Sequence, residues 1–235
     1  MTSLKGRVIA LVLFAVAFGY LEAAIVIYLR SIYQPVRAEL YPDRPSESLF
    51  PVISFDELKR RGWEHERQLY VELGRELSTL VMLAAVAWGA CRSRREWFAM
   101  FSLMFGVWDI CFYVFLRLLI GWPTSLWEWD ILFLLPTIWT GPVIAPLLVS
   151  VGLIAGALWL LVREAVGRPY RAPLWCRLGV LVGGLLIILA FCWDRRSVAT
   201  GEMPGPFPWG LFLLGLVGGF ACFSYGGLRA KKTGD

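Results

Sequence analysis

Six long apolar stretches, bounded by charged residues, dominate the sequence. A helix that crosses a bilayer needs about 20 mostly apolar residues, because each residue adds about 1.5 Å and the hydrocarbon core is about 30 Å thick. The sequence therefore predicts an all-α polytopic membrane protein with about six transmembrane helices, in which residues 1–235 form a single transmembrane domain. The predicted helices cover residues 8–29, 69–91, 97–120, about 143–162, 174–193 and 207–228.

The composition agrees with this class and removes several kinds of active site. Of the 235 residues, 58% are hydrophobic and 17% are charged, against roughly 45–50% and 25% in soluble domains. The single His and the five Cys, which lack C-x-x-C spacing, exclude bis-His haem sites, di-iron His sites and c-type haem attachment. The sequence has no nucleotide-binding loop, serine-hydrolase motif or zinc-type spacing. We therefore predict no cofactor and no catalytic residue, and the sequence favours a protein that is not an enzyme.

The fourth apolar stretch is too long and too rich in proline for one straight helix. Proline removes a backbone donor and clashes with the preceding turn. We predict a broken or re-entrant segment before the fourth transmembrane helix, with a short half-helix over residues 131–139. Asp130 or Ser125 is predicted to cap this half-helix, and the alternative is that the N-terminus of the half-helix faces an anion or a substrate. The residues that interrupt the stretch are Pro136, Gly141, Pro142 and Pro146.

Basic residues gather where the ends of the predicted helices would share one side of the membrane. Since cytoplasmic loops carry an excess of Lys and Arg, we predict that both termini are cytoplasmic. The same residues account for most of the net charge of +5, so no nucleic acid is predicted as a partner. They are Lys5, Arg7, Arg92, Arg94, Arg95, Arg163, Arg168, Arg171, Arg177, Arg229, Lys231 and Lys232.

A cleavable signal peptide is the alternative for the N-terminus. Lys5, Arg7 and residues 15–17 resemble its charged, apolar and cleavage regions. The apolar run continues to residue 29, which favours a transmembrane helix.

Residues 30–67 are predicted as an extracytoplasmic loop with an interfacial helix around residues 55–67. His65 lies there beside Glu64 and Glu66 and is predicted to lie on a solvated helix face. The alternative for His65 is a ligand or proton-sensor role.

The predicted helices over residues 8–29 and 97–120 share a short sequence pattern. Glu22 and Arg30 follow Gly19, and Asp109 and Arg117 follow Gly106, with an offset of eight from acid to arginine in both. This pattern suggests duplication of a two-helix unit, as in some transporters. The alternative is that the glycines only allow neighbouring helices to approach closely.

Three carboxylates lie well inside predicted transmembrane helices, where a charged group costs at least about 2.5–3.5 kcal/mol. Counting residues from the helix ends predicts that Glu22, Glu76 and Asp109 meet in one layer in the outer half of the membrane. Glu72 lies one turn from Glu76 on the same helix face. The candidate counter-charges are Arg75 and Arg117.

Three interpretations of these residues stay open at this point. Each acid can be paired and set the register between helices. Closely placed acids can instead share protons and form an ion or proton pathway. A hard-cation metal site with oxygen ligands is the third interpretation, and the metal is unknown. The leading functional hypothesis is movement of a small ion, proton or solute, and the alternative is a non-catalytic accessory or structural subunit of a larger membrane complex.

The sequence also resembles an uncharacterised group of bacterial multi-pass inner-membrane proteins with no known activity. The similar phrases are residues 19–24, Arg75-Glu76 before the apolar run to Trp88, residues 106–109, and residues 129–133 with Gly141-Pro142. The resemblance implies a bacterial inner membrane as the location and transfers no functional residue. The predicted partners are the lipid bilayer and other membrane subunits or further copies of this chain.

Overall fold

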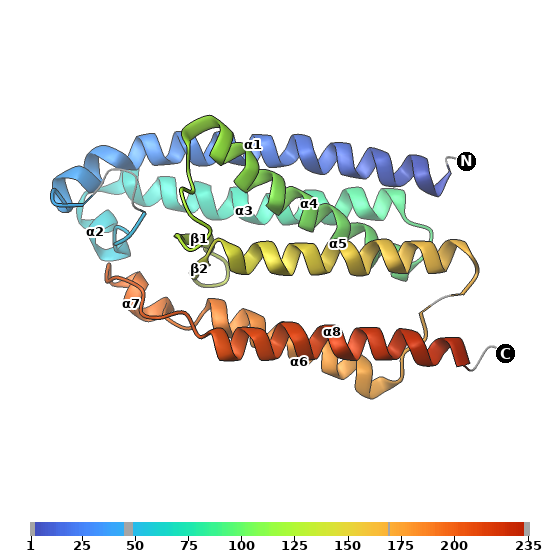
Figure 1. Ribbon diagram of the computed structural model, residues 1–235. Helices are drawn as coiled ribbons and strands as arrows, with labels where there is room; N and C mark the ends of the chain where they lie inside the picture. Colours follow the sequence, from blue (N-terminus) through green and yellow to red (C-terminus); the bar gives the residue numbers. More distant parts are fainter. Residues whose placement is uncertain (1–2, 45–48, 169, 233–235) are drawn as a thin grey trace.

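The computed structural model shows a bundle of long helices that run along one common direction (Figure 1). The structure describes residues 3–44, 49–168 and 170–232, and for residues 63–66 and 228–232 it describes the backbone only. In chain order the elements are α1 (Leu4–Leu40), α2 (Phe55–Arg60), α3 (Trp63–Ala90), α4 (Arg94–Ile120), β1 (Trp129–Phe133), β2 (Trp139–Pro142), α5 (Ile144–Ala165), α6 (Leu174–Phe191), α7 (Arg195–Ala199) and α8 (Trp209–Lys232).

Within the described residues, five helices are long and apolar enough to cross a membrane: α1, α4, α5, α6 and α8. The predicted fold class, an all-α polytopic membrane protein, is therefore confirmed. The helix predicted over residues 69–91 is also present as part of α3. It is not among the five, and its first half carries Glu72, Arg75 and Glu76.

The bundle has two distinct ends (Figure 1). At one end, here the terminal end, α1 begins and α8 ends. The opposite end, here the hairpin end, contains α2, α7 and the strands β1 and β2. The start of α1 and the end of α8 therefore lie on the same side of the molecule.

The segment before α5 is broken, as predicted, but the half-helix over residues 131–139 was a wrong prediction. The segment forms an antiparallel hairpin in which Trp129 pairs with Pro142 and Phe133 pairs with Trp139. Proline disfavours helical backbone both at its own position and at the residue before it, so extended backbone is the alternative. Strand pairing then satisfies backbone groups that a broken helix would leave free. Asp130 lies in β1, so its predicted role as a helix cap is also wrong.

The predicted loop over residues 30–67 is more helical than expected. The first helix continues through this region as far as Leu40. The predicted interfacial helix over residues 55–67 is divided at Gly62, whose φ of 111° is readily adopted only by glycine. His65 lies in the first turn of α3, and its side chain is outside the described residues.

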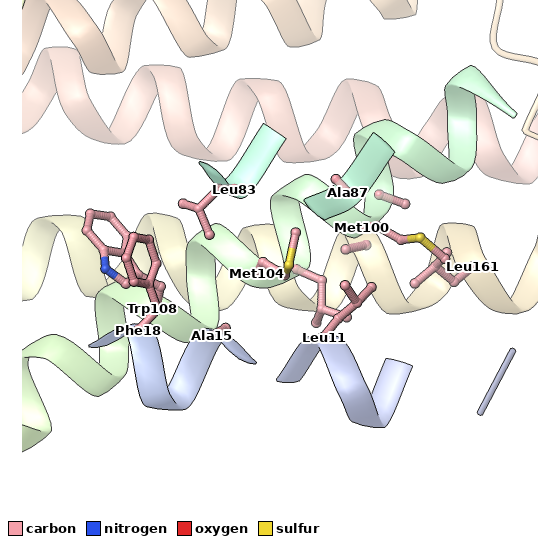
Figure 2. Packing of buried hydrophobic residues seen from close by; sticks show 12 residues of the cluster. Leu11, Ala15, Phe18, Leu83, Ala87, Met100, Met104, Trp108 and Leu161 are labelled. Atoms are coloured by element: carbon pink, nitrogen blue, oxygen red, sulfur yellow. The ribbon is translucent and has the colours of Figure 1, made fainter. Parts of the chain in front are cut away.

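A buried apolar cluster joins α1, α3, α4 and α5 (Figure 2). Its members recur every three or four residues along each helix, which places them on one face. This cluster makes the four helices one packed group, here the four-helix group. The labelled members are Leu11, Ala15 and Phe18 of α1, Leu83 and Ala87 of α3, Met100, Met104 and Trp108 of α4, and Leu161 of α5.

The two glycines of the shared sequence pattern lie where helices approach closely. A Cβ atom on Gly19 would lie 2.8 Å from the Cβ of Cys111, and one on Gly106 would lie 2.7 Å from the carbonyl oxygen of Ser150. Real Cβ atoms do not approach other atoms this closely. Close helix packing therefore accounts for both glycines without a duplicated functional unit.

The helices α6 and α8 form a second, glycine-packed pair, here the α6–α8 pair. A Cβ atom on Gly183 would lie 2.7 Å from the carbonyl oxygen of Gly215. Toward the hairpin end, Trp139 of β2 stacks on Phe191 of α6 at 6.3 Å between ring centroids. Nearer the terminal end, Trp159 of α5 meets Phe223 of α8 at 5.3 Å. Aromatic contacts thus join this pair to β2 at one level and to α5 of the four-helix group at another.

A buried ion pair fastens the start of α1 to the connection between α3 and α4. The guanidinium of Arg7 donates to both carboxylate oxygens of Glu96, at 2.9 and 3.1 Å, and to the carbonyl oxygen of Ala90 at 2.7 Å. Both side chains are 9% exposed. One of the basic residues used to predict orientation is therefore neutralised inside the protein.

We expect Arg7→Met to lower the free energy of unfolding by about 3–5 kcal/mol, because Glu96 would remain buried without its counter-charge. Reversible unfolding in mixed detergent micelles measures this change. Lys5→Met is the matched control, since Lys5 is exposed on the same turn of α1. Equal effects of the two substitutions would contradict a stabilising role of the ion pair.

Candidate functional site

A cavity of about 1120 Å³ lies between the α6–α8 pair and the four-helix group. Its wall on α4 extends from Phe98 to Ile120. At 1.5 Å per residue this wall is about 30 Å long, which is the thickness of the hydrocarbon core of a bilayer. The cavity therefore follows the transmembrane direction of the bundle over almost its whole length.

The two halves of the cavity differ in polarity. Toward the terminal end the wall is almost entirely apolar, with Phe98, Phe105, Leu160 and Phe223 among its residues. Toward the hairpin end the wall is rich in ionisable groups. These are Glu22, Arg30, Tyr33, Arg37, Glu72, Arg75, Glu76, Asp109, Tyr113 and Asp130.

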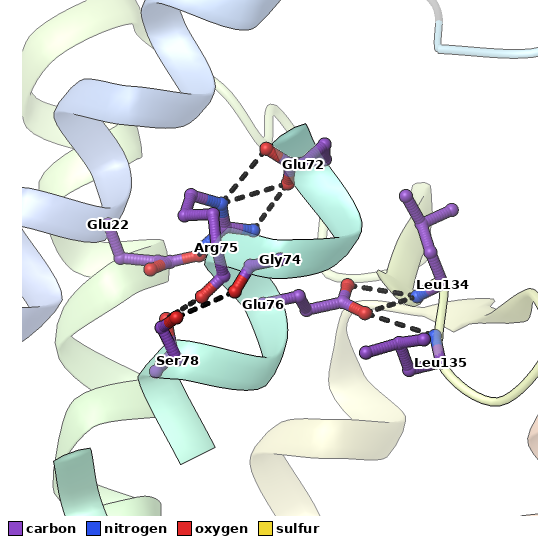
Figure 3. Close-up of polar contacts among 9 residues, drawn as sticks. Glu22, Glu72, Gly74, Arg75, Glu76, Ser78, Leu134 and Leu135 are labelled. Carbon is purple, nitrogen blue, oxygen red and sulfur yellow. Dashed lines mark hydrogen bonds and ion pairs between the residues drawn. The ribbon is translucent and has the colours of Figure 1, made fainter. Parts of the chain in front are cut away.

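Glu22 and Glu72 share one arginine (Figure 3). Arg75 of α3 forms an ion pair with Glu22 of α1. The Nε atom of Arg75 also donates to the two carboxylate oxygens of Glu72, at 3.0 and 2.9 Å. The exposed fractions of the three side chains are 8% for Glu22, 18% for Arg75 and 14% for Glu72. The structure thus brings together three of the residues proposed from sequence, and two carboxylates flank one guanidinium.

Glu76 points away from this ion pair, toward the hairpin (Figure 3). Its carboxylate accepts hydrogen bonds from the backbone N–H of Leu134, at 2.9 and 3.0 Å, and of Leu135, at 3.0 Å. Both donors lie in the turn between β1 and β2. A carboxylate inside the bundle therefore fixes the tip of the hairpin through main-chain donors, which no residue pattern in the sequence indicated.

Asp109 and Asp130 each have a hydroxyl donor of their own. Ser150 of α5 donates to Asp109 of α4 at 2.8 Å, and Tyr113 of α4 donates to Asp130 of β1 at 2.8 Å. Asp109 and Tyr113 are four residues apart and lie on one face of α4. Burial raises the pKa of the Asp130 carboxyl to about 6, although the Arg30 guanidinium and the Tyr113 hydroxyl both act to lower this pKa.

Asp130 is a buried wall residue of the cavity that sequence reasoning assigned to a helix cap. The available signal was its position between Trp129 and the apolar run 131–135. An acid between a tryptophan and an apolar run is expected to be buried when the segment forms a strand rather than a half-helix.

Arg117 belongs to a different part of the structure from the acids. It is exposed, and it donates to the carbonyl oxygens of Gly121 and Pro123, the latter at 3.0 Å. A basic residue in the last turn of a helix stabilises the free carbonyl groups there. The described contacts of Arg117 are with the loop after α4, so the structure does not place it as a counter-charge for the acids.

Arg30 also lines the cavity. The sequence drew attention to it only as part of the pattern shared by the first and third predicted helices. Its guanidinium carbon lies 3.9 Å from the centroid of the Trp122 ring. The Nε and Nη2 atoms of Arg30 are buried, and neither has a hydrogen-bond partner among the described residues. Two donors at the hairpin end of the cavity are therefore unsatisfied by the described part of the protein.

The described residues contain no group of three or more His, Cys, Asp or Glu side chains that could hold a metal ion. The described residues therefore offer no ligand set of this kind for the hard-cation site that the sequence left open. The carboxylates instead accept hydrogen bonds from arginine, hydroxyl and backbone donors.

No protein-family model, curated protein or solved structure matches this chain. The resemblance to bacterial inner-membrane proteins therefore stays a prediction.

We expect Glu76→Ala to speed hydrogen exchange at the backbone amides of Leu134 and Leu135. Loss of a hydrogen bond to a charged group, about 1.5–3 kcal/mol, corresponds to about tenfold or more in local opening. Hydrogen–deuterium exchange with mass spectrometry, read on peptides that cover the hairpin turn, measures the change.

Ser78→Ala is the control for this substitution, because Ser78 is exposed two residues away on α3. Unchanged exchange at the hairpin turn in Glu76→Ala would show that the carboxylate does not fix the turn.

Proposed function

We propose that this integral membrane protein binds a small amphipathic solute in the cavity and moves it within the membrane. The observation that carries the proposal is the division of one elongated cavity into an apolar half and an ionisable half. An amphipathic molecule gains about 25 cal/mol for each Å² of apolar surface that it buries. Its polar part would meet hydrogen-bonding side chains at the hairpin end.

Entry from the bilayer is supported by exposed apolar residues on the cavity wall. Phe98 of α4 is 54% exposed and Phe220 of α8 is 52% exposed, and both residues line the cavity. Both lie on helices that are apolar enough to cross a membrane. In a membrane such exposed faces would meet hydrocarbon, as lateral entry of a solute from the bilayer requires.

In this proposal the acids form the polar half of the binding site. Glu22, Glu76 and Asp109 each have a different donor, which favours fixed polar positions over a proton shared among the three. Transport of protons or cations by these acids stays a prediction. The alternative, that the protein is an accessory subunit of a larger membrane complex, also stays a prediction.

We further propose that the protein resides in a bacterial inner membrane with both termini in the cytoplasm. The termini lie at the same end of the bundle (Figure 1). The sequence concentrates Lys and Arg in the segments that meet at this end, and cytoplasmic segments carry such an excess.

Substitutions that fill the cavity test the proposed function. A Cβ atom on Gly184 meets nothing within 4 Å, and Gly184 lines the cavity. We expect Gly184→Leu to reduce solute movement severalfold without loss of stability, since leucine also favours helix more than glycine does. The assay uses proteoliposomes with an NBD-labelled phospholipid as the probe and follows the fraction that external dithionite reduces.

Gly218→Leu is the matched control, because Gly218 on α8 also has open space at its Cβ position but does not line the cavity. Vesicles with wild-type protein should expose the probe of both leaflets, as should vesicles with Gly218→Leu. If vesicles with wild-type protein behave like protein-free vesicles, the proposed movement of an amphipathic solute is wrong.

A further inference from the structure

The polar residues at the hairpin end of the cavity include one continuous face of α1. Arg30, Tyr33, Gln34 and Arg37 all line the cavity and follow one another at intervals of three, one and three residues. Residues at this spacing lie on the same side of a helix. This face, here the arginine face, begins about two turns beyond Glu22, toward the end of α1.

Within the arginine face, Arg30 has hydrogen-bonding capacity that the described protein does not use. Its guanidinium carbon lies over the Trp122 ring, and the Nε and Nη2 donors are buried without a described partner. A buried donor without a partner costs about 1–3 kcal/mol. A ligand that supplies acceptor oxygens at this point would remove that cost.

The acids of the cavity outnumber its arginines, but none of them accepts a hydrogen bond from the Nε or Nη2 atom of Arg30. Their oxygens already accept hydrogen bonds from Arg75, Leu134, Leu135, Ser150 and Tyr113. The unsatisfied groups are donors, and a cation cannot accept hydrogen bonds from them. Phosphate and carboxylate oxygens match the planar fork of a guanidinium.

We propose that the arginine face binds the anionic headgroup of a lipid, phosphate in chemistry, whose apolar chain lies in the cavity. This inference rests on the proposed function and names its class of solute. Residues of the arginine face and of the apolar half line the same cavity, so headgroup and chain would have adjoining places. Arg30 is the principal headgroup ligand, and Tyr33, Gln34 and Arg37 supply the surrounding polar contacts.

The test compares two lipids with identical acyl chains and different headgroup charge. Protein purified in a neutral detergent is titrated with phosphatidylglycerol or with phosphatidylcholine, and native mass spectrometry measures the fraction with bound lipid. We expect tighter binding of phosphatidylglycerol by the wild type. Arg30→Gln should weaken phosphatidylglycerol binding about tenfold or more, as for loss of a hydrogen bond to a charged group. Its affinity for phosphatidylcholine, whose phosphate is offset by the choline cation, should fall less, and the binding that remains shows that the variant is folded.

Arg44→Gln is the matched control, since it removes the same charge from an exposed position away from the cavity. An equal loss of phosphatidylglycerol binding in Arg30→Gln and Arg44→Gln would overturn the proposal, because general surface charge would explain both. Inorganic phosphate and glycerol 3-phosphate form a further arm. If either displaces phosphatidylglycerol at equal concentration, the site takes a soluble anion and the lipid assignment is wrong.

Gly184→Leu separates failure of this inference from failure of the proposed function. If it weakens binding of both lipids while Arg30→Gln changes neither, the cavity binds amphipathic molecules without headgroup selection by Arg30. If Gly184→Leu leaves the binding of both lipids unchanged, the cavity is not the binding site and the proposed function fails as well.

Discussion

Hydrocarbon offers no hydrogen bonds, so each polar group that a helix carries into the bilayer needs a partner within the protein. The acids along the cavity meet this constraint through donors from other elements. Arg75 of α3 pairs with Glu22 of α1, Ser150 of α5 donates to Asp109 of α4, and the hairpin backbone donates to Glu76. Each of these contacts joins two elements that are distant in the sequence. The polar groups therefore set the register of the helices in addition to lining the cavity.

The hairpin of β1 and β2, between α4 and α5, connects the four-helix group with the α6–α8 pair. Its turn is fixed to α3 through Glu76, and its second strand carries Trp139, which stacks on Phe191 of α6. The α6–α8 pair is packed internally through Gly183 and Gly215. It contacts β2 through Trp139 and Phe191, and α5 of the four-helix group through Trp159 and Phe223. The cavity lies between this pair and the four-helix group.

Arg30 differs from the other charged groups of the cavity. The guanidinium of Arg75 is engaged by carboxylates on both sides, whereas two donors of Arg30 have no described partner. A binding site differs from a structural ion pair in this respect, since part of its hydrogen-bonding capacity is left for the ligand. The polarity of the cavity thus supports an amphipathic ligand, and the unpartnered donors of Arg30 support an anionic group on it.

The sequence by itself determined the class of the protein and the positions of its long helices, because apolar length and bounding charge are local properties. Proline also located the break before α5, yet a short apolar run does not distinguish a half-helix from a strand, and the tertiary structure decided for a hairpin. Counting residues placed Glu22, Glu76 and Asp109 at related depths, but depth does not specify which way a side chain points. The partners of these acids, the exclusion of Arg117 from their contacts, the burial of Asp130 and the cavity itself depend on how helices rotate and pack against elements far away in the chain. Only the tertiary structure decides those contacts, because they join residues whose separation in sequence carries no geometric information.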